Sequence, residues 1–328
     1  METLLLDPED VTASTEMREV IGAVEAAFGA YERGDTKMPA KSYIDLPQYN
    51  GDFRSMPAYI DADDWEAAGI KWVNSHADNP DNHDLPTVMG TMIYSDPETA
   101  FPLALLDGTG LTQLRTGAAA AVATDHLGRE DATSLGLVGA GIQAYTQLEA
   151  IAAVRDIETV VLADKDAAAI AAFDAEFGDQ FDVSEGSIAE AAACDVVSTT
   201  TPVREPIVEE VAPGTHINAM GADAPGKHEI ADDVLADATI VIDDYEQCTH
   251  SGEINVPWSE GLLDDENLHA EIGAVVTGEA AGRTADDEVT VFDSTGLAIQ
   301  DVAAAHVVYE HARENDIGTP FSLVGTRA

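Results

Sequence analysis

Ser134-Leu-Gly-Leu-Val-Gly-Ala-Gly-Ile-Gln-Ala144 contains an apolar run that ends in two closely spaced glycines. The apolar residues predict a buried strand, Gly139-x-Gly141-x-x-Ala144 predicts a tight turn, and residues 145–154 continue as a helix. The N–H groups at the start of such a helix are free to bind a pyrophosphate. Glycine turns also join strands to helices for structural reasons alone, so the motif by itself leaves a plain strand-helix-strand unit open.

An acidic residue after the next apolar run favours a dinucleotide site. Residues 158–163 form that run, and Asp164 follows Gly139 by 25 residues. A Rossmann fold places at about this distance the carboxylate that accepts hydrogen bonds from the adenosine ribose. Asp164 would also repel the 2′-phosphate of NADP, whereas Lys165 would partly offset that repulsion. We therefore predict that the cofactor is NAD.

The patterns on either side of the glycine turn predict two architectures of an α/β protein. An amphipathic helix at 15–33 and short strands come first and predict an antiparallel sheet. Alternating strands and helices follow and predict a doubly wound parallel sheet of six strands. The expected strands are 42–46, 53–56, 68–73, 87–94 and 103–107, then 134–138, 159–163, 181–183, 195–200, 215–220 and 239–243. The expected helices are 111–127, 143–154, 166–177, 187–193 and 229–236, and the chain returns through 289–296 to a helix at 297–313.

The charge balance is strongly acidic. The 328 residues include 62 Asp and Glu against 15 Lys and Arg, a net charge of −47. This charge argues against nucleic acid and anionic membranes as partners. A hydrophobic content of 45% and regular periodicity argue against disorder. An acid-covered surface of the halophilic kind is favoured, because concentrated salt screens the repulsion between its carboxylates.

Other compositional features narrow the class of protein. The chain has no run of 18 apolar residues and no signal-peptide pattern, so a cytoplasmic protein is expected. Cys194 and Cys248 are too few for a disulfide framework or a zinc motif. The histidines form no HExxH or similar pair, so no metal is expected.

The few cations form a candidate substrate site. Lys41, Arg54, Lys71 and Arg115 all precede the predicted nucleotide fold, and Lys71 lies between Ile70 and Trp72 in a predicted strand. Charges in such strands either alternate out to solvent or point into a cleft. Because the chain has only five lysines, we favour a pocket that binds a carboxylate, for which the planar fork of Arg is suited.

A loop rich in Gly and Pro follows the strand predicted at 215–220. Open α/β sheets bind their ligands at the carboxyl ends of their strands, which is where Asp223 is expected. Asp223 either caps the next helix or acts as an acid/base group beside the nicotinamide, with Lys227 holding the loop or a phosphate. The threonines at 199–201, at the end of the preceding strand, can contact ribose or phosphate.

Taken together, several segments resemble the ornithine cyclodeaminase/μ-crystallin family over nearly the whole chain. The segments are 54–60, 69–76, 114–120, 139–144, 221–229 and 292–301. Within the family, Trp72-Val-Asn-Ser-His76, His216-Ile-Asn-Ala219 and Gly252-Glu-Ile-Asn-Val256 are most similar to the archaeal alanine dehydrogenase branch. The resemblance implies a homodimer of two-domain subunits. A split α/β domain of residues 1–118 and 297–328 would bind substrate and dimerise, and a Rossmann domain of residues 119–296 would bind NAD.

The resemblance also implies roles for individual residues. Lys71 and Asp223 match catalytic positions, and the substrate positions are Lys41, Arg54, Lys71, Arg115 and Thr295. The cofactor positions are Thr87, Arg115, Thr116, Gly139, Gly141, Ile142, Gln143, Asp164, Lys165, Thr200, Met220, Gly221, Ala222, Asp223, Lys227 and Ser294.

The implied activity is NAD-dependent, reversible oxidative deamination of a small amino acid, L-alanine, to the oxo acid pyruvate and ammonia. Conversion of L-ornithine to L-proline and ammonia, ketimine or pyrroline reduction, and dinucleotide-dependent binding without catalysis remain open. The presence of both Lys71 and Asp223 favours catalysis over binding alone.

Overall fold

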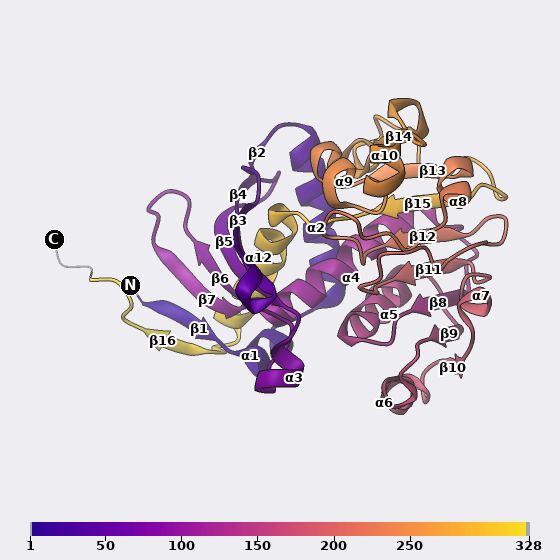
Figure 1. Cartoon of the computed structure of the whole chain (residues 1–328). Helices are drawn as coiled ribbons and strands as arrows, with labels where there is room; N and C mark the ends of the chain where they lie inside the picture. Colours follow the sequence, from indigo (N-terminus) through magenta and orange to yellow (C-terminus); the bar gives the residue numbers. More distant parts are fainter. Residues whose placement is uncertain (1, 326–328) are drawn as a thin grey trace. The chain divides into compact units, whose positions relative to one another are not determined.

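The computed structural model describes residues 2–325, which form two compact units (Figure 1). The first unit runs up to Arg115 and resumes at Leu297, and the second comprises Thr116–Gly296. The boundary falls within the alanine-rich helix α4 (Gly108–Leu127). The side chains from Ala118 to Ala123 are buried. Their small size lets the surrounding elements pack closely against this helix.

The first unit is built on a mixed sheet. Over the described residues, the strands are β1 (Thr3–Leu6), β2 (Thr36–Lys37), β3 (Ser42–Leu46), β4 (Gly51–Asp61), β5 (Glu66–His76), β6 (Val88–Ser95), β7 (Pro102–Asp107) and β16 (Thr319–Phe321). Their order is β16-β1-β7-β6-β5-β4-β2, with β3 paired to β4. The predicted antiparallel sheet extends from β7 to β3, and the unpredicted strand β1 adds a parallel pairing with β7.

Helices cover one face of this sheet. The helices of the unit are α1 (Pro8–Ala13), α2 (Met17–Glu32), α3 (Asn79–His83), the short η1 (Pro47–Tyr49) and α12 (Ala298–Glu314). α12 packs against α2 and against β4, β5 and β6. Along β5 the side chains of Lys71 and Val73 are buried, whereas Trp72 between them is exposed. Since successive strand residues point to opposite faces, Lys71 lies on the face that α12 covers.

The second unit is a doubly wound parallel sheet, as predicted, but with eight strands in the described chain rather than six. The strands are β8 (Ser134–Val138), β9 (Thr159–Ala163), β10 (Asp182–Glu185), β11 (Val196–Thr199), β12 (His216–Ala219), β13 (Thr239–Ile242), β14 (Leu268–Glu271) and β15 (Thr290–Asp293). Their order is β10-β9-β8-β11-β12-β15-β13-β14, and every pairing is parallel.

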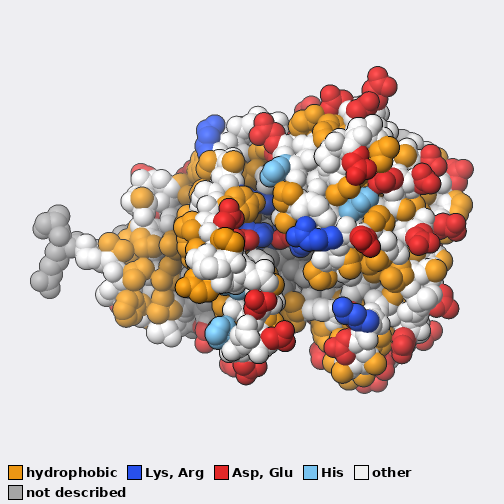
Figure 2. Space-filling view, viewed as in Figure 1, with side chains coloured by type: hydrophobic (Ala, Val, Ile, Leu, Met, Phe, Trp, Pro, Cys, Tyr) orange, Lys and Arg blue, Asp and Glu red, His pale blue; other side chains and the backbone are white. Residues whose placement is uncertain are grey.

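The predicted six strands did not include β15, since 289–296 was expected to return the chain to its last helix. This fully buried strand pairs with β12 on one side and β13 on the other, so it lies inside the sheet. The helices of the unit are α5 (Ile142–Val154), α6 (Ala167–Phe177), α7 (Ile188–Ala191), α8 (Asp232–Asp237), α9 (Tyr245–Ser251), α10 (Asn255–Glu260) and α11 (Ile272–Val276), with η2 (Asp265–Asn267) before β14. Figure 2 shows acidic side chains distributed over the surface of this unit.

Candidate functional site

Lys71 is a buried amine in the first unit. Only 1% of its surface is exposed. Its Nζ donates hydrogen bonds to Asp301 Oδ1 of α12 at 2.6 Å and to Thr112 Oγ1 of α4 at 3.1 Å. Burial lowers the pKa of Lys71 to about 8, against the opposing effect of Asp301 and with help from the charges of Arg115 and Lys41. A lysine with this pKa can exchange a proton near neutral pH.

Arg115 meets Lys71 on the same carboxylate. Its Nε donates to Asp301 Oδ1 at 3.1 Å, and its Nη1 donates to Gln300 Oε1 at 3.0 Å. Two of the predicted substrate residues are therefore brought together, and Lys41 is close enough to influence the pKa of Lys71. The prediction assigned no role to Asp301, although an acid directly before the apolar run 302–305 of a helix was a readable signal of a buried ion pair.

Arg54 shares this face of the sheet. It pairs in register with Val73, and directly opposed residues in an antiparallel pair point the same way. Its guanidinium donates to the carboxylate of Asp52, from Nε to Oδ1 at 2.9 Å and from Nη2 to Oδ2 at 3.1 Å.

Thr87, predicted as a cofactor contact, lies beside the end of β5. Its backbone carbonyl accepts a hydrogen bond from His76 N at 2.8 Å.

The glycine turn of the second unit has the geometry that a dinucleotide needs. Gly139 adopts φ +105°, a conformation that favours glycine. A Cβ at Gly141 would meet nothing within 4 Å, so the start of α5 has open space for a phosphate. Asp164 Oδ2 accepts a hydrogen bond from Ala140 N at 2.7 Å, which places this carboxylate at the turn. Ile142 is exposed at the first position of α5.

The loop after β11 is held by a residue that sequence reasoning missed. Glu229 Oε1 accepts hydrogen bonds from the backbone N and the Oγ1 of Thr201, at 2.9 and 2.7 Å, and its Oε2 accepts from Thr199 Oγ1 at 2.8 Å. These two hydroxyls thus already donate within the protein. The Thr200 hydroxyl instead lies by the glycine turn, 3.0 Å from where a Cβ of Gly139 would be.

Asp223 and Lys227 form an ion pair in the loop after β12. Lys227 Nζ donates to Asp223 Oδ1 at 2.5 Å and to the carbonyl of Gly221 at 3.3 Å. The alternative that Asp223 caps the next helix is wrong, because the N-cap of α8 is Ala231. Lys227, predicted to hold the loop or a phosphate, therefore contacts the loop through Gly221 and Asp223.

The turn after β15 carries the last predicted residues. Ser294 Oγ and Gly296 N donate to Asp243 Oδ2 at 2.8 and 3.0 Å. Asp243 follows β13, so one carboxylate fixes the turn that presents Ser294 and Thr295. The glycine turn, Asp164, the 199–201 loop, the Asp223 loop and this turn all lie at the carboxyl ends of their strands, where open α/β sheets bind ligands.

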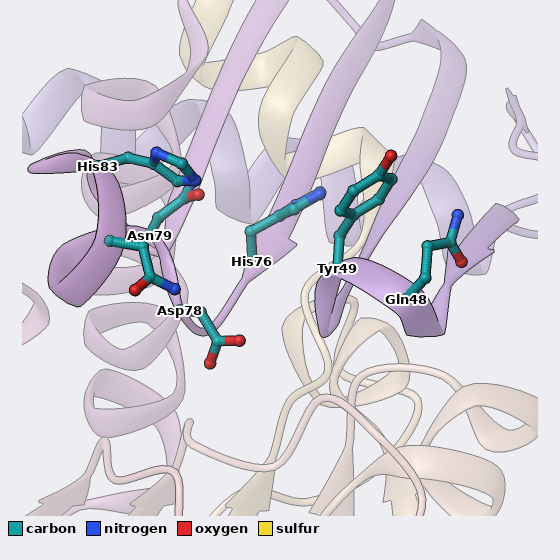
Figure 3. Close-up of a pocket in the computed structure, with 7 residues that line it drawn as sticks. Gln48, Tyr49, His76, Asp78, Asn79 and His83 are labelled. Carbon is teal, nitrogen blue, oxygen red and sulfur yellow. The ribbon is translucent and has the colours of Figure 1, made fainter.

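A separate cavity of about 230 Å³ lies in the first unit and is lined by none of the predicted residues (Figure 3). Its walls come from η1, the end of β5 and α3, and include Tyr49, His76 and His83. Within residues 2–325, no three His, Cys, Asp or Glu side chains are arranged to hold a metal ion. No helix of that range is both long and apolar enough to cross a membrane.

The fold and these motifs define a class of protein, an α/β protein with a Rossmann-like dinucleotide unit. Residues 1–316 match the ornithine cyclodeaminase/mu-crystallin family, and the chain belongs to this family.

Two relatives are similar to this chain over nearly its whole length. The alanine dehydrogenase of Archaeoglobus fulgidus is 48% identical over 322 residues, which cover 97% of this chain and 98% of the relative. A Delta(1)-pyrroline-2-carboxylate reductase of Bacillus cereus is 35% identical over 314 residues, covering 92% of this chain and 94% of the relative.

Solved structures of an alanine dehydrogenase and of a pyrroline-carboxylate reductase have folds similar to that of this chain. An archaeal alanine dehydrogenase dimer with bound NAD superimposes with a TM-score of 0.93 at 47% identity, covering 99% of this chain and 100% of the other. The Thermococcus litoralis Delta(1)-pyrroline-2-carboxylate reductase, in complex with NADH and L-proline, gives a TM-score of 0.92 at 35% identity, covering 97% and 99%.

Proposed function

We propose that this protein is an alanine dehydrogenase, which interconverts L-alanine, NAD and water with pyruvate, ammonia, NADH and a proton. The observation that carries the proposal is the buried Lys71 amine, held with Arg115 on one oxygen of Asp301. The similarity to the A. fulgidus enzyme over nearly the whole of both chains supports the same substrate.

The first unit supplies substrate binding and proton transfer. Arg54 and Arg115 bind the α-carboxylate of the amino acid through their planar guanidinium groups. Neutral Lys71 accepts a proton from the substrate ammonium. Bound NAD would supply the acceptor for the hydride that leaves Cα. Lys71 then passes this proton to solvent, takes a proton from the water that attacks the imine carbon, and returns that proton to the nitrogen as ammonia leaves.

The second unit supplies the cofactor site. The glycine turn and the start of α5 would hold the pyrophosphate, and Asp164, which lies at that turn, would accept hydrogen bonds from the adenosine ribose. Asp223 is proposed as a second group for proton transfer, supported by its place at the ligand-binding edge and by its ion pair with Lys227.

The family relatives supply a second candidate reaction. Reductases of Delta(1)-pyrroline-2-carboxylate share 35% identity with this chain, so reduction of a cyclic imine to L-proline is the chief alternative. The deciding experiment incubates the purified protein and NAD with L-alanine, L-proline or L-ornithine, and follows NADH and proline. NADH formation with L-alanine alone supports the proposal. NADH formation with L-proline alone favours the reductase, and proline formation from L-ornithine favours a cyclodeaminase.

We also propose a homodimer in a cytoplasmic, salt-rich setting. The sheet face opposite α12 exposes Trp72 and Ile93, and Ile44 of β3, in register with Phe53, is exposed on the same face. Apolar side chains gathered on a sheet face are typical of a protein-protein interface. A similar archaeal structure is a dimer, which supports the same arrangement. The charge of −47 supports the salt-rich setting.

A further inference from the structure

We propose that Asp301 is a positioning residue, which fixes the Lys71 amine and the Arg115 guanidinium in place and governs when Lys71 carries a proton. This inference rests on the proposed function, in which those two cations act on the amino acid. Asp301 itself is not assigned a contact with the substrate.

The geometry makes Asp301 the shared partner. One oxygen, Oδ1, accepts from Lys71 Nζ at 2.6 Å and from Arg115 Nε at 3.1 Å. Asp301 is fully buried and Lys71 is 1% exposed, so water does not screen the pair. Two buried cations this close would repel one another without the carboxylate between them.

The position of Asp301 is set by its own helix. It lies in the first turn of α12, where the helix dipole favours a negative charge. The preceding residue, Gln300, accepts hydrogen bonds at Oε1 from Leu297 N at 3.1 Å and from Arg115 Nη1 at 3.0 Å. The start of α12 therefore positions Asp301, and it orients the Arg115 guanidinium through Gln300 before any substrate binds.

Asp301 faces the two functional cations with its Oδ1 oxygen. Among the residues that the structure describes, Oδ2 is buried without a hydrogen-bond partner. The Oδ1 contacts place the carboxylate charge against both functional cations, where it stabilises the charged form of each.

The negative charge of Asp301 favours the protonated form of Lys71. Burial lowers the pKa of Lys71, Asp301 raises it, and the charges of Arg115 and Lys41 lower it, with a result of about 8. Removing the negative charge of Asp301 removes the contributions that raise this pKa. Lys71 would then lose its proton at lower pH and would no longer cycle between its two forms near neutrality.

The test compares Asp301→Asn with the wild-type protein over a range of pH. The acid limb of kcat/KM for L-alanine is expected to move to lower pH by about one unit or more, since a neighbouring opposite charge shifts a pKa by about that amount. The KM for NAD is expected to stay unchanged. Asp195→Asn is the matched control: Asp195 pairs with Arg129 in the other unit at 3.1 Å, and its loss should leave the pH profile in place.

A direct titration of Lys71 separates this inference from the proposed function. The chain has only five lysines, so NMR of 13C-labelled lysine gives few signals, and Lys71→Arg identifies the one of interest. A lower pKa in Asp301→Asn supports the positioning role even if L-alanine is not the substrate. If Asp301→Asn does not fold, Asp301→Glu takes its place, with a displaced carboxylate and an altered Lys71 pKa expected. A folded variant whose Lys71 titration and pH profile match the wild type overturns the proposal.

Discussion

Lys71 is the single residue on which the proposed proton transfer depends most. Lys71→Met keeps a long apolar stem in the buried position but removes the amine. We expect kcat for L-alanine oxidation to fall by about 10²- to 10⁴-fold, the usual contribution of a general base. Initial rates of NADH formation measure the loss, and NADH fluorescence checks that cofactor binding is retained. Lys37→Met, at an exposed strand position, is the control; equal activity of the two variants contradicts the role of Lys71.

Asp164 decides between the two nicotinamide cofactors in our proposal. Its carboxylate accepts a hydrogen bond from Ala140 N at the glycine turn, close to where a 2′-phosphate would lie. Asp164→Ser is expected to raise kcat/KM with NADP by about tenfold, because one unfavourable charge contact is removed. Asp166→Ser is the matched control, since Asp166 caps α6 through Ala168 N. A wild-type enzyme that prefers NADPH over NADH contradicts the assignment.

The sequence was enough to propose Lys71 and Arg115 as site residues but not the residue that joins them. A scarce cation in an apolar strand, such as Lys71, or in an alanine-rich helix, such as Arg115, is visible in a local window, as is the glycine turn with Asp164. Asp301 lies 230 positions from Lys71, and only the packing of α12 on β5 brings the two together. The role of Glu229 was hidden for the same reason, because its partners Thr199 and Thr201 come from the end of another strand.

Among elements, local periodicity predicted most strands and helices but not their neighbours in space. β8 and β9 lie at the predicted residues, and α12 begins one residue after its predicted start. β15 was visible as an apolar run, yet nothing in that run says that it lies between β12 and β13. Strand order depends on how crossovers pack, which is a property of the assembled sheet.

The buried end of β15 makes stability depend on pH. Asp293 accepts hydrogen bonds from Glu253 N at 2.8 Å and Ile254 N at 3.2 Å. Burial raises the pKa of Asp293 to about 7, and the charge of Asp243 adds to the effect. The folded protein therefore binds this proton more tightly than the unfolded chain. The contribution of Asp293 to stability is fully present below its ordinary pKa and is lost as pH rises towards 7.

Denaturant unfolding of wild type and Asp293→Asn, at fixed salt, isolates this contribution. The free energy of unfolding of the wild type minus that of the variant is expected to fall as pH rises from about 4 to 7. Taking the difference removes the titration of the buried histidines, which is common to both proteins. A difference that grows with pH over this range contradicts the raised pKa of Asp293.

The charge of the whole molecule leads to a prediction about salt. At ~0.1 M ionic strength the Debye length is about 10 Å, so repulsion among surface carboxylates is only partly screened, whereas at ~1 M it is about 3 Å. Because the chain has 62 Asp and Glu against 15 Lys and Arg, we expect the proposed dimer to need molar salt to stay folded and assembled. Thermal unfolding and sedimentation over a salt series measure both properties. KCl and NaCl should act alike, since screening depends on ionic strength, and full stability and activity at ~0.1 M salt contradict the halophilic interpretation.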